Sequence, residues 1–477
     1  MRGRSVSIAC AGWLIATMIT APAALGAPNL TLDTFDDTFD GSCVDGDCSL
    51  RDAIAAVDDG GTVRVPPGFY PLSLSGPGSA AGDLDLVRPV RIIGIGETGS
   101  FLDASGLGAR VFDVRADVTI RHLTLLGGSQ VRAGGVLRAT NGTSELLETT
   151  VFGGRARDGG AVTVGDGATV TVDRSWISSN QATARGGALY VGGTAFVSRS
   201  TVSGNTATGG GGAFVAPTGS LSLADSTFSG NVAVRGGGVR AAGDVELFSS
   251  TIAGNRAEVG GAVMLGSSSS SSAANSVFAR NRASVRGPMC VGTLVSLGHN
   301  IADAGGCGLT SPSDLTGVDP GLGILGPNGG PTPTHALKVD SPAVRRGAGC
   351  NDTDQRGAPR SHCDSGAYEL VLCLGRPVTI VGTPGADDLS GGLGRDVFLG
   401  LGGNDVFQGS VNADRACGGE GGDHLIGGPG DDRLAGGDGG DVLWGESGDD
   451  RLIGGMGVDV CRGGAGSDIR RGCETVS

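Results

Sequence analysis

The sequence predicts an all-β fold, a right-handed parallel β-helix followed by a parallel β-roll. Two internal repeats carry this prediction, one of about 25 residues in the centre of the chain and one of nine residues toward its C-terminus. Composition agrees, because 92 of the 477 residues are glycine and they show no collagen-like period of three. Frequent glycine combined with longer fixed periods indicates a chain that turns tightly and often, as stacked coils do.

The first 26 residues are predicted to be a secretory signal peptide. Arg2 and Arg4 precede an apolar run from about Ile8 to Ile19, and small residues near Gly26 offer a cleavage site. The apolar run is too short to cross a bilayer, and no other segment approaches the length of a transmembrane helix. We therefore expect a secreted, extracellular protein without a transmembrane segment, and leave open whether it associates with a cell surface.

A short N-terminal cap is expected over residues 27–58, before the first coil. The run Cys48–Ile54 reads as a helix, with Ser49 as its N-cap and Asp52 at the third position of a capping box. The first strand, Thr62–Val65, follows directly. Such a cap covers the open end of a parallel stack, which otherwise invites edge-to-edge association.

Residues 59–370 are predicted to form the β-helix together with a C-terminal closing segment. A short phrase recurs five times, and its asparagines are 25, 26, 24 and 26 residues apart. They are Asn180, Asn205, Asn231, Asn255 and Asn281. Three short strands and three turns fit one period, and stacking in register places like residues above like. We expect these asparagines to form a structural ladder at one turn.

The C-terminal segment, residues 371–477, contains ten consecutive nonapeptides between Gly382 and Arg471. Their sixth position is always aspartate: Asp387, Asp396, Asp405, Asp414, Asp423, Asp432, Asp441, Asp450, Asp459 and Asp468. Loop glycines accompany them: Gly385, Gly394, Gly403, Gly421, Gly430, Gly439, Gly448 and Gly457. The eighth position is mostly apolar. We expect six residues of loop and three of strand in each repeat, with the eighth side chain pointing inward.

This spacing predicts calcium as the ligand of the β-roll. Two nonapeptides close one turn, so aspartates eighteen residues apart stack in two columns of five, with room for at most four ions between the loops of each column. Calcium takes about six to eight oxygen ligands, whereas magnesium demands a tighter octahedron. The repeats carry sixteen acidic residues against seven arginines. We expect the segment to be disordered or expanded without calcium and to fold when several ions bind.

Cysteine content supports an oxidising compartment. Of the eleven cysteines, Cys10 lies in the predicted signal peptide, and the other ten are interpreted as structural disulfides. Near neighbours along the chain suggest the pairs Cys43 with Cys48, Cys290 with Cys307, Cys350 with Cys363, and Cys461 with Cys473, which leaves Cys373 and Cys417. Spacing alone does not decide this connectivity.

The nonapeptides closely resemble the haemolysin-type, or RTX, calcium-binding repeats of exported bacterial proteins. This resemblance implies calcium ligands among the aspartates and loop glycines. We expect weaker or missing ions at two departures from the pattern: Ser410 and Asn412 replace glycines in one repeat, and Arg470 takes the inward position of the last. Many proteins with such repeats lack an N-terminal signal, so the export route of this chain is expected to differ.

Two further resemblances concern the β-helix. The stretch Cys48–Ile54 is similar to the CSLREA-type cap found at the start of bacterial β-helix proteins. Phrases between Ser296 and Glu369, such as Asp354–Gly357, are similar to the closing segment of the extracellular choice-of-anchor β-helix family. These resemblances imply a pectin-lyase-like β-helix and an extracellular location more than they imply an activity.

Catalytic residues are not apparent in the β-helix. Asp158 and Asp173 lie among arginines, but the converging carboxylates of a glycosidase are not recognisable, and we interpret these charges as a solvated strand face. Lys338 is the only lysine that could neutralise a uronate. His299 and His335 occur in loop-like phrases, where we expect them to hydrogen-bond the backbone.

The formal charge of −14 argues against a nucleic-acid partner, because phosphate binding needs a basic surface. The sequence favours a secreted calcium-ion-binding protein whose β-helix binds or adheres to polysaccharide or another surface. Two alternatives stay open. One is a β-helix polysaccharide lyase or glycoside hydrolase, and the other is a β-roll that serves only export and stability. No catalytic residue is assigned, and a role without catalysis is favoured.

Overall fold

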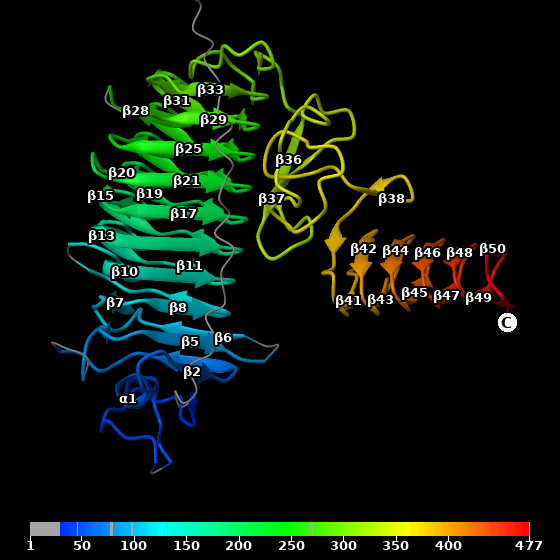
Figure 1. The fold of residues 1–477 in the computed structure, drawn as a ribbon, viewed down its shortest axis with the longest axis horizontal. Helices are drawn as coiled ribbons and strands as arrows, with labels where there is room; N and C mark the ends of the chain where they lie inside the picture. Colours follow the sequence, from blue (N-terminus) through cyan, green and yellow to red (C-terminus); the bar gives the residue numbers. More distant parts are fainter. Residues whose placement is uncertain are drawn as a thin grey trace, which may run out of the picture.

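The computed structural model describes residues 29–476 except 45, 77–79, 97–98, 131 and 268. The predicted signal peptide and Cys10 lie outside the described residues. The predicted all-β fold class, a right-handed parallel β-helix followed by a parallel β-roll, is confirmed. Figure 1 shows the β-helix as a tall stack of coils, the closing segment beside it, and the β-roll extending away from the coils. No helix in the described residues is long and apolar enough to cross a membrane.

The N-terminal cap contains strand β1 (Asn29–Thr31) and helix α1 (Leu50–Ala56), followed by β2 (Gly61–Val65). The capping box forms as predicted, because the Ser49 side chain accepts from the Asp52 amide and the Asp52 carboxylate accepts from the Ser49 amide. Strand β1 pairs in parallel with β2, so the cap also adds a strand to the first coil.

Three parallel sheets form the walls of the β-helix. Sheet 1 has eighteen strands: β1, β2, β4 (Leu84–Leu86), β5 (Val90–Gly94), β7 (Phe112–Val114), β8 (Val118–Arg121), β10 (Leu137–Leu147), β13 (Val162–Asp173), β16 (Leu189–Val191), β17 (Thr194–Ser198), β20 (Ala213–Val215), β21 (Ser220–Ala224), β24 (Val239–Ala241), β25 (Asp244–Phe248), β28 (Val263–Leu265), β29 (Ser272–Ala274), β32 (Cys290–Val291) and β33 (Val295–Gly298). Sheet 2 has eleven: β3 (Gly68–Pro71), β6 (Ser100–Asp103), β9 (Leu123–Leu126), β11 (Thr150–Phe152), β14 (Trp176–Ser178), β18 (Thr201–Ser203), β22 (Thr227–Ser229), β26 (Thr251–Ala253), β30 (Val277–Ala279), β34 (Ile301–Ala302) and β35 (Leu315–Thr316). Sheet 3 has six: β12 (Arg155–Asp158), β15 (Gln181–Arg185), β19 (Thr206–Gly209), β23 (Val232–Arg235), β27 (Arg256–Val259) and β31 (Arg282–Arg286).

Strict register between coils builds the core of the β-helix. The middle residue of each short strand of sheet 2 points inward and is fully buried: Val151, Ile177, Val202, Phe228, Ile252 and Phe278. The asparagines form the expected ladder. The backbone amide and Nδ2 of Asn205, for example, both donate to Oδ1 of Asn231, each at 3.0 Å. Since the next coil supplies these acceptors, the ladder satisfies buried polar groups at a turn.

The closing segment lies along the side of the β-helix rather than over its end. It contains the antiparallel strands β36 (Leu322–Gly326) and β37 (Thr334–Leu337). The Thr227 hydroxyl donates to Gln355 Oε1 at 2.6 Å, and the Ala367 amide donates to the Thr251 hydroxyl at 3.0 Å. The loop that carries the buried Cys307 packs on the core at the end of the coils instead.

The prediction that Asp158 and Asp173 belong to a solvated strand face was wrong. Both residues are buried, with 8% and 7% of their surface exposed. Arg185 binds Asp158 through two hydrogen bonds of 2.8 and 3.0 Å, and Arg199 binds Asp173 through two of 2.9 and 2.8 Å. Each arginine comes from the following coil: Arg185 stacks directly over Asp158, and Arg199 follows Ser198, which stacks over Asp173. Sequence distance hides this proximity.

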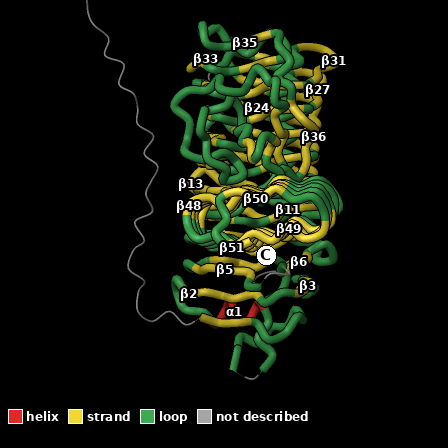
Figure 2. The backbone as a smooth tube through the Cα atoms, turned by 90° about the vertical axis from the view of Figure 1, so that its right-hand side faces the viewer, coloured by secondary structure: helices red, strands yellow, loops and turns green. Residues whose placement is uncertain are grey.

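The β-roll follows the antiparallel pair β38 (Leu372–Cys373) and β39 (Arg376–Pro377). One of its two parallel sheets contains β40 (Ile380–Val381), β42 (Val397–Gly402), β44 (Arg415–Glu420), β46 (Arg433–Asp438), β48 (Arg451–Met456) and β50 (Ile469–Arg471). The other contains β41 (Asp388–Ser390), β43 (Val406–Gln408), β45 (His424–Pro429), β47 (Val442–Ser447), β49 (Val460–Ala465) and β51 (Thr475–Val476). Figure 2 views the roll end-on, where its turns superimpose as a flattened ring.

Two features of the roll bear on its expected geometry. The eighth-position side chains form its core as expected, with Phe398, Phe407 and Leu425 fully buried. The central strands have six residues where three were expected, because pairing with the next turn continues into the glycine loop, as between Glu446 and Gly464.

The ten cysteines in the described part of the chain form five disulfides: Cys43–Cys48, Cys290–Cys307, Cys350–Cys363, Cys373–Cys417 and Cys461–Cys473.

Candidate metal centre

Two columns of aspartates run along the edges of the β-roll. Each column is held by the same bond: the backbone amide of one aspartate donates to Oδ1 of the aspartate eighteen residues later. The distance is 2.7 Å from Asp414 to Asp432 and 2.8 Å from Asp423 to Asp441. Corresponding bonds join Asp387 to Asp405, Asp396 to Asp414, Asp405 to Asp423, Asp432 to Asp450, Asp441 to Asp459 and Asp450 to Asp468. The register of the roll therefore brings all ten predicted aspartates into two stacks.

The second carboxylate oxygen is left without a partner in the interior of both stacks. Among the described residues, Oδ2 is buried and accepts no hydrogen bond in Asp405, Asp414, Asp423, Asp432, Asp441, Asp450 and Asp459. A buried carboxylate oxygen without a partner is costly, because burial removes its hydration. Seven such oxygens in register indicate a site for a ligand rather than seven separate accidents of packing.

The first glycine of each nonapeptide makes room for this oxygen. A Cβ atom added at any of these positions would lie 2.8 Å or less from Oδ2 of the aspartate five residues later. The positions are Gly382, Gly391, Gly400, Gly409, Gly418, Gly427, Gly436, Gly445, Gly454 and Gly463. Sequence reasoning missed them as site residues, although their glycine is as regular along the ten repeats as the aspartate itself.

The predicted loop glycines serve the backbone of the same loops. Gly403, Gly421 and Gly439 have φ angles of 106°, 123° and 136°, which favour glycine. A Cβ atom at Gly421 would also collide with the Gly403 carbonyl oxygen one turn below. Gly430, Gly448 and Gly457 share both features, and so does Gly466, which was not predicted. In the first two repeats, Gly385 and Gly394 lack the positive φ angle.

The electrostatics of the stacks favour a cation as the ligand. Burial raises the pKa of the interior carboxyls, the amide hydrogen bond to Oδ1 lowers it, and the neighbouring carboxylates of the column raise it further. The pKa reaches about 6 for Asp414 and Asp423 and about 7 for Asp432. The pKa values of Asp405, Asp441 and Asp450 are raised in the same direction.

Calcium suits this donor set. It is a hard cation that takes about six to eight oxygens in a flexible geometry, and stacked loops with carboxylate Oδ2 atoms and glycine carbonyls supply oxygen only. Among the described residues, no three His, Cys, Asp or Glu side chains converge on one point. A bound ion would therefore need backbone carbonyls as ligands in addition to the carboxylates. The residues that would hold the ions are the interior aspartates and the loop glycines.

The ends of the stacks differ from their interior. Oδ2 of Asp387 accepts from the Thr383 amide at 2.5 Å, and Oδ2 of Asp396 accepts from the Gly392 amide at 2.7 Å. At the other end, the side chain of Arg470 lies 3.5 Å from Oδ2 of Asp468. The departure at position 470 thus places a competing cation beside the last aspartate.

Glu474 extends one column by a route that the nine-residue period does not reveal. Its Oε2 accepts from the Asp459 amide at 2.6 Å, as the next aspartate of the column would. The disulfide Cys461–Cys473 holds this shortened final turn against the preceding strand. Only the proximity of an acidic residue to the last cysteine could have suggested this role.

The defective repeat keeps the path of the roll. Ser410 and Asn412 adopt φ angles of 81° and 77°, in place of the glycines found in other repeats. Leu401 and Glu446 adopt the same left-handed conformation at the second position of their repeats, with φ angles of 81° and 73°. Such angles strain residues that carry a Cβ atom. The expectation of weaker calcium binding beside Ser410 stays a prediction.

Comparison with known families bears on these repeats directly. A family model described as RTX calcium-binding nonapeptide repeat, in four copies, matches residues 381–416, 408–443, 418–452 and 435–469. Residues 381–469 are RTX calcium-binding repeats. This RTX region contains all ten aspartates of the two columns. The segment that follows it, which closes the final turn through Glu474, lies outside the matched residues.

Comparison with curated proteins gives no match for this chain. Among solved structures, the chain is similar to pectate lyase Pel9A, with a TM-score of 0.43, 17% identity, and coverage of 72% of this chain and 97% of that chain. It is also similar to a variant of the PL6 family alginate lyase AlyGC, with a TM-score of 0.23, 9% identity, and coverage of 92% of this chain and 76% of that chain. The β-helix is established by its own strand pairing.

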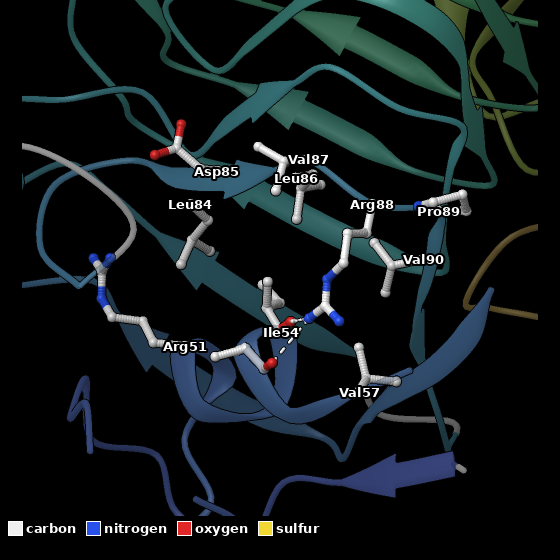
Figure 3. Close-up of a pocket in the computed structure, with 11 residues that line it drawn as sticks. Arg51, Ile54, Val57, Leu84, Asp85, Leu86, Val87, Arg88, Pro89 and Val90 are labelled. Atoms are coloured by element: carbon white, nitrogen blue, oxygen red, sulfur yellow. Dashed lines mark hydrogen bonds between the residues drawn. The ribbon is translucent and has the colours of Figure 1, made fainter. Parts of the chain in front are cut away.

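Two other hollows were candidates for a site. The first lies under helix α1, where Arg88 Nη2 donates to the carbonyls of Ile54 and Ala55 at 3.2 and 2.8 Å (Figure 3). These bonds satisfy the C-terminal end of the helix. Buried Arg51 at its edge donates to the Gly82 carbonyl at 2.6 Å and also pairs with Asp37. These contacts hold the N-terminal cap against the first coils.

The second hollow, of about 970 Å³, lies where the β-helix, the closing segment and the first turn of the RTX region meet. On the β-helix side, Glu148 contacts His122 and accepts from Arg174 at 2.8 Å. Burial alone would raise the pKa of Glu148, but the positive charges of Arg174 and Arg121 beside it lower this pKa. Arg199 and Asp387 complete opposite walls of the hollow.

The histidines singled out in the sequence are bound to the backbone. His299 Nδ1 lies 2.7 Å from the Arg346 carbonyl oxygen, and His335 Nδ1 lies 3.0 Å from that of Gly323. His335 Nε2 also lies 2.8 Å from the Ser229 hydroxyl, and burial lowers the pKa of this histidine. Both residues fasten the closing segment.

Proposed function

We propose that this is a secreted protein whose RTX region folds around several calcium ions and whose β-helix binds extracellular polysaccharide or a cell surface. The observation that carries the calcium part is the series of buried, partnerless Oδ2 oxygens, each facing a first-position glycine. Five disulfides suit an oxidising compartment outside the cell. The predicted signal peptide at residues 1–26 supports the same location.

Folding and ion binding are coupled through the charge of the columns. Without an ion, each interior aspartate buries a carboxylate beside like charges one turn above and below. Bound calcium supplies positive charge and takes up the unpaired oxygens. Since the thin core of the roll contributes one side chain per nonapeptide, ion binding becomes a large part of its folding free energy.

A calcium titration of the full chain tests this part. Circular dichroism should report a gain of β-structure on adding calcium and its loss on adding a chelator, and magnesium should give a much weaker response. Limited proteolysis should locate the change in residues 371–477. If that segment resists protease equally with calcium and with chelator, ion-coupled folding is wrong, and the roll would be a permanently folded device for export or stability.

A second candidate function, a polysaccharide lyase or glycoside hydrolase, is favoured by one observation. The hollow between β-helix and RTX region gathers Glu148, His122, Arg174 and Arg199, which could neutralise a uronate and move a proton. Polyuronates incubated with the protein should then yield unsaturated ends. Loss of that product in Glu148→Gln, with unchanged folding and calcium response, would support catalysis there. Absence of new ends from uronate and neutral polysaccharides alike would leave binding as the function.

A further inference from the structure

Part of the outer face of sheet 2 is left uncovered beside the closing segment. The closing segment bonds to the outer face of β18, β22 and β26, whereas β9, β11 and β14 face a groove of about 610 Å³. Leu325 of β36 forms its wall on the side of the closing segment. We call this the aromatic groove, and its other main lining residues are Thr124, Leu126, Thr150, Phe152, Trp176 and Ser178.

Two aromatic rings on neighbouring coils form the floor of the aromatic groove. Phe152 and Trp176 flank the inward-pointing Val151 and Ile177, so alternation along the strands turns both rings outward. Phe152 is 46% exposed. The Trp176 indole Nε1 donates to the Ser203 hydroxyl at 2.9 Å, which fixes the orientation of its ring.

The same face continues toward the N-terminal coils with more aromatic rings. Strand register places Phe69, Phe101, Thr124, Thr150 and Trp176 in one column. Phe69 and Phe101 are exposed on adjacent coils. Because parallel strands are spaced by about 4.8 Å, this column presents rings and hydroxyls at regular steps along the coil axis.

The chemistry of the aromatic groove selects the class of ligand. None of its described lining residues carries a charge. Aromatic faces offer apolar contact to the C–H face of a sugar ring, and the hydroxyls of Thr124 and Thr150 can bond to sugar hydroxyls. A uronate polymer would bring a carboxylate at every ring, no described lining residue of the groove is a cation that could pair with it, and desolvating an unpaired charge is unfavourable.

We propose that the aromatic groove binds an uncharged polysaccharide chain that runs along the coil axis. The closing segment already lies on the same face of sheet 2 and is held there by strand hydroxyls. Thr201, for example, donates to the Pro333 carbonyl at 2.5 Å. The polysaccharide site continues this interface. This face therefore accepts an extended polar chain. The inference rests on the proposed polysaccharide-binding function and names its surface and ligand class.

Affinity electrophoresis of the full chain with calcium, in gels that contain a neutral β-glucan, a neutral mannan or polygalacturonate, tests the proposal. A neutral polymer should retard the wild type, with little effect of salt. Phe152→Ala and Trp176→Phe should weaken that retention, roughly tenfold for the loss of the exposed ring. The matched control is Phe196→Ala, because Phe196 is 47% exposed on β17 of sheet 1 and far from the groove. Its retention should equal that of the wild type.

Fluorescence provides a readout that does not depend on loss of a side chain. Trp13 lies in the predicted signal peptide, so in the processed chain a Trp444→Phe variant keeps Trp176 as its tryptophan. Its emission should change on adding the retarding polymer and stay unchanged with polygalacturonate. Retention by polygalacturonate alone, unaffected by Phe152→Ala, would overturn the aromatic groove while leaving polysaccharide binding intact. Retention by none of the polymers would overturn both. A dimer that Phe152→Ala dissociates would show that a second copy occupies the face, and would also overturn the proposal.

Discussion

The backbone amide of Asp414 donates a 2.7 Å hydrogen bond to Oδ1 of Asp432, whose Oδ2 has no partner. One oxygen of each interior aspartate thus maintains the stack, and the other is left for a ligand. An asparagine could perform the first task but not the second. This division explains why the sixth position of the interior repeats is aspartate although only its Oδ1 accepts a hydrogen bond there.

Asp432→Asn should separate these two tasks. The amide oxygen can still accept from Asp414, so the roll keeps its register, but one negative oxygen is lost. We expect the calcium midpoint, followed by circular dichroism, to rise roughly tenfold or more. The control is Asp431→Asn in the same loop, because Asp431 is exposed and accepts from the Asp449 amide at 3.0 Å. Equal midpoints for the two variants would show that Oδ2 of Asp432 is not a ligand.

First-position glycines should be as sensitive as the aspartates. A Cβ atom at Gly436 would occupy the space of Asp441 Oδ2, whereas a Cβ atom at Gly440 would have no neighbour nearer than 3.4 Å. Gly436→Ala should therefore weaken calcium binding strongly, and Gly440→Ala should leave it almost unchanged. Isothermal titration calorimetry of both variants measures the difference. Similar binding by both would mean that the carboxylate can move aside without loss.

The nine-residue period was sufficient to predict most of the candidate centre. It places aspartates eighteen residues apart on one edge, and alternation along the strands turns residues such as Leu425 inward. Contributions outside the period were not predictable. Glu474 lies fifteen residues after Asp459 rather than eighteen, and its role depends on how the disulfide shortens the final turn.

Contacts between residues far apart in the sequence limited what could be predicted for the β-helix. The coil repeats predicted the stacking and the asparagine ladder, because both are properties of one coil and its neighbour. The bond between Thr227 and Gln355 joins residues 128 positions apart that no repeat relates, so the side-on position of the closing segment was not foreseen. The same holds for the ion pair between Asp158 and Arg185, since coil lengths vary and the vertical neighbour of a residue is not at a fixed distance.

Strain at the second position of the repeats can be relieved. Glu446 is exposed and has a φ angle of 73°, while the residues above and below it in the column, Gly464 and Gly428, are glycine. Glu446→Gly should stabilise the calcium-loaded roll by about 1 kcal/mol, the cost of a left-handed residue with a Cβ atom. Glu420→Gly is the control, because Glu420 lies at the third position without a positive φ angle, and this change should be neutral or destabilising. Chemical denaturation in saturating calcium compares them, and a loss of stability in Glu446→Gly would contradict the expectation.

Acid should have opposite effects on the two states of the roll. In the folded roll, burial raises the pKa of Asp432 to about 7 and the pKa values of Asp414 and Asp423 to about 6, above the value of about 3.9 in an unfolded chain. Protonation is therefore favoured by folding, so these groups destabilise the calcium-free roll progressively as pH rises from about 4 through about 7. Calcium requires the ionised carboxylates, so its affinity should fall over the same range as pH is lowered.

The two trends predict a crossing that one experiment can detect. With chelator, the roll should be more ordered at about pH 5 than at about pH 8, and with saturating calcium the order should be reversed. Emission from Trp444, in a Trp176→Phe background, reports on the roll alone among the described residues. Asp432→Asn should reduce the pH dependence seen with chelator, because it removes the group with the most strongly raised pKa. A calcium-free roll that loses order on acidification would show that these carboxyls are solvated rather than buried.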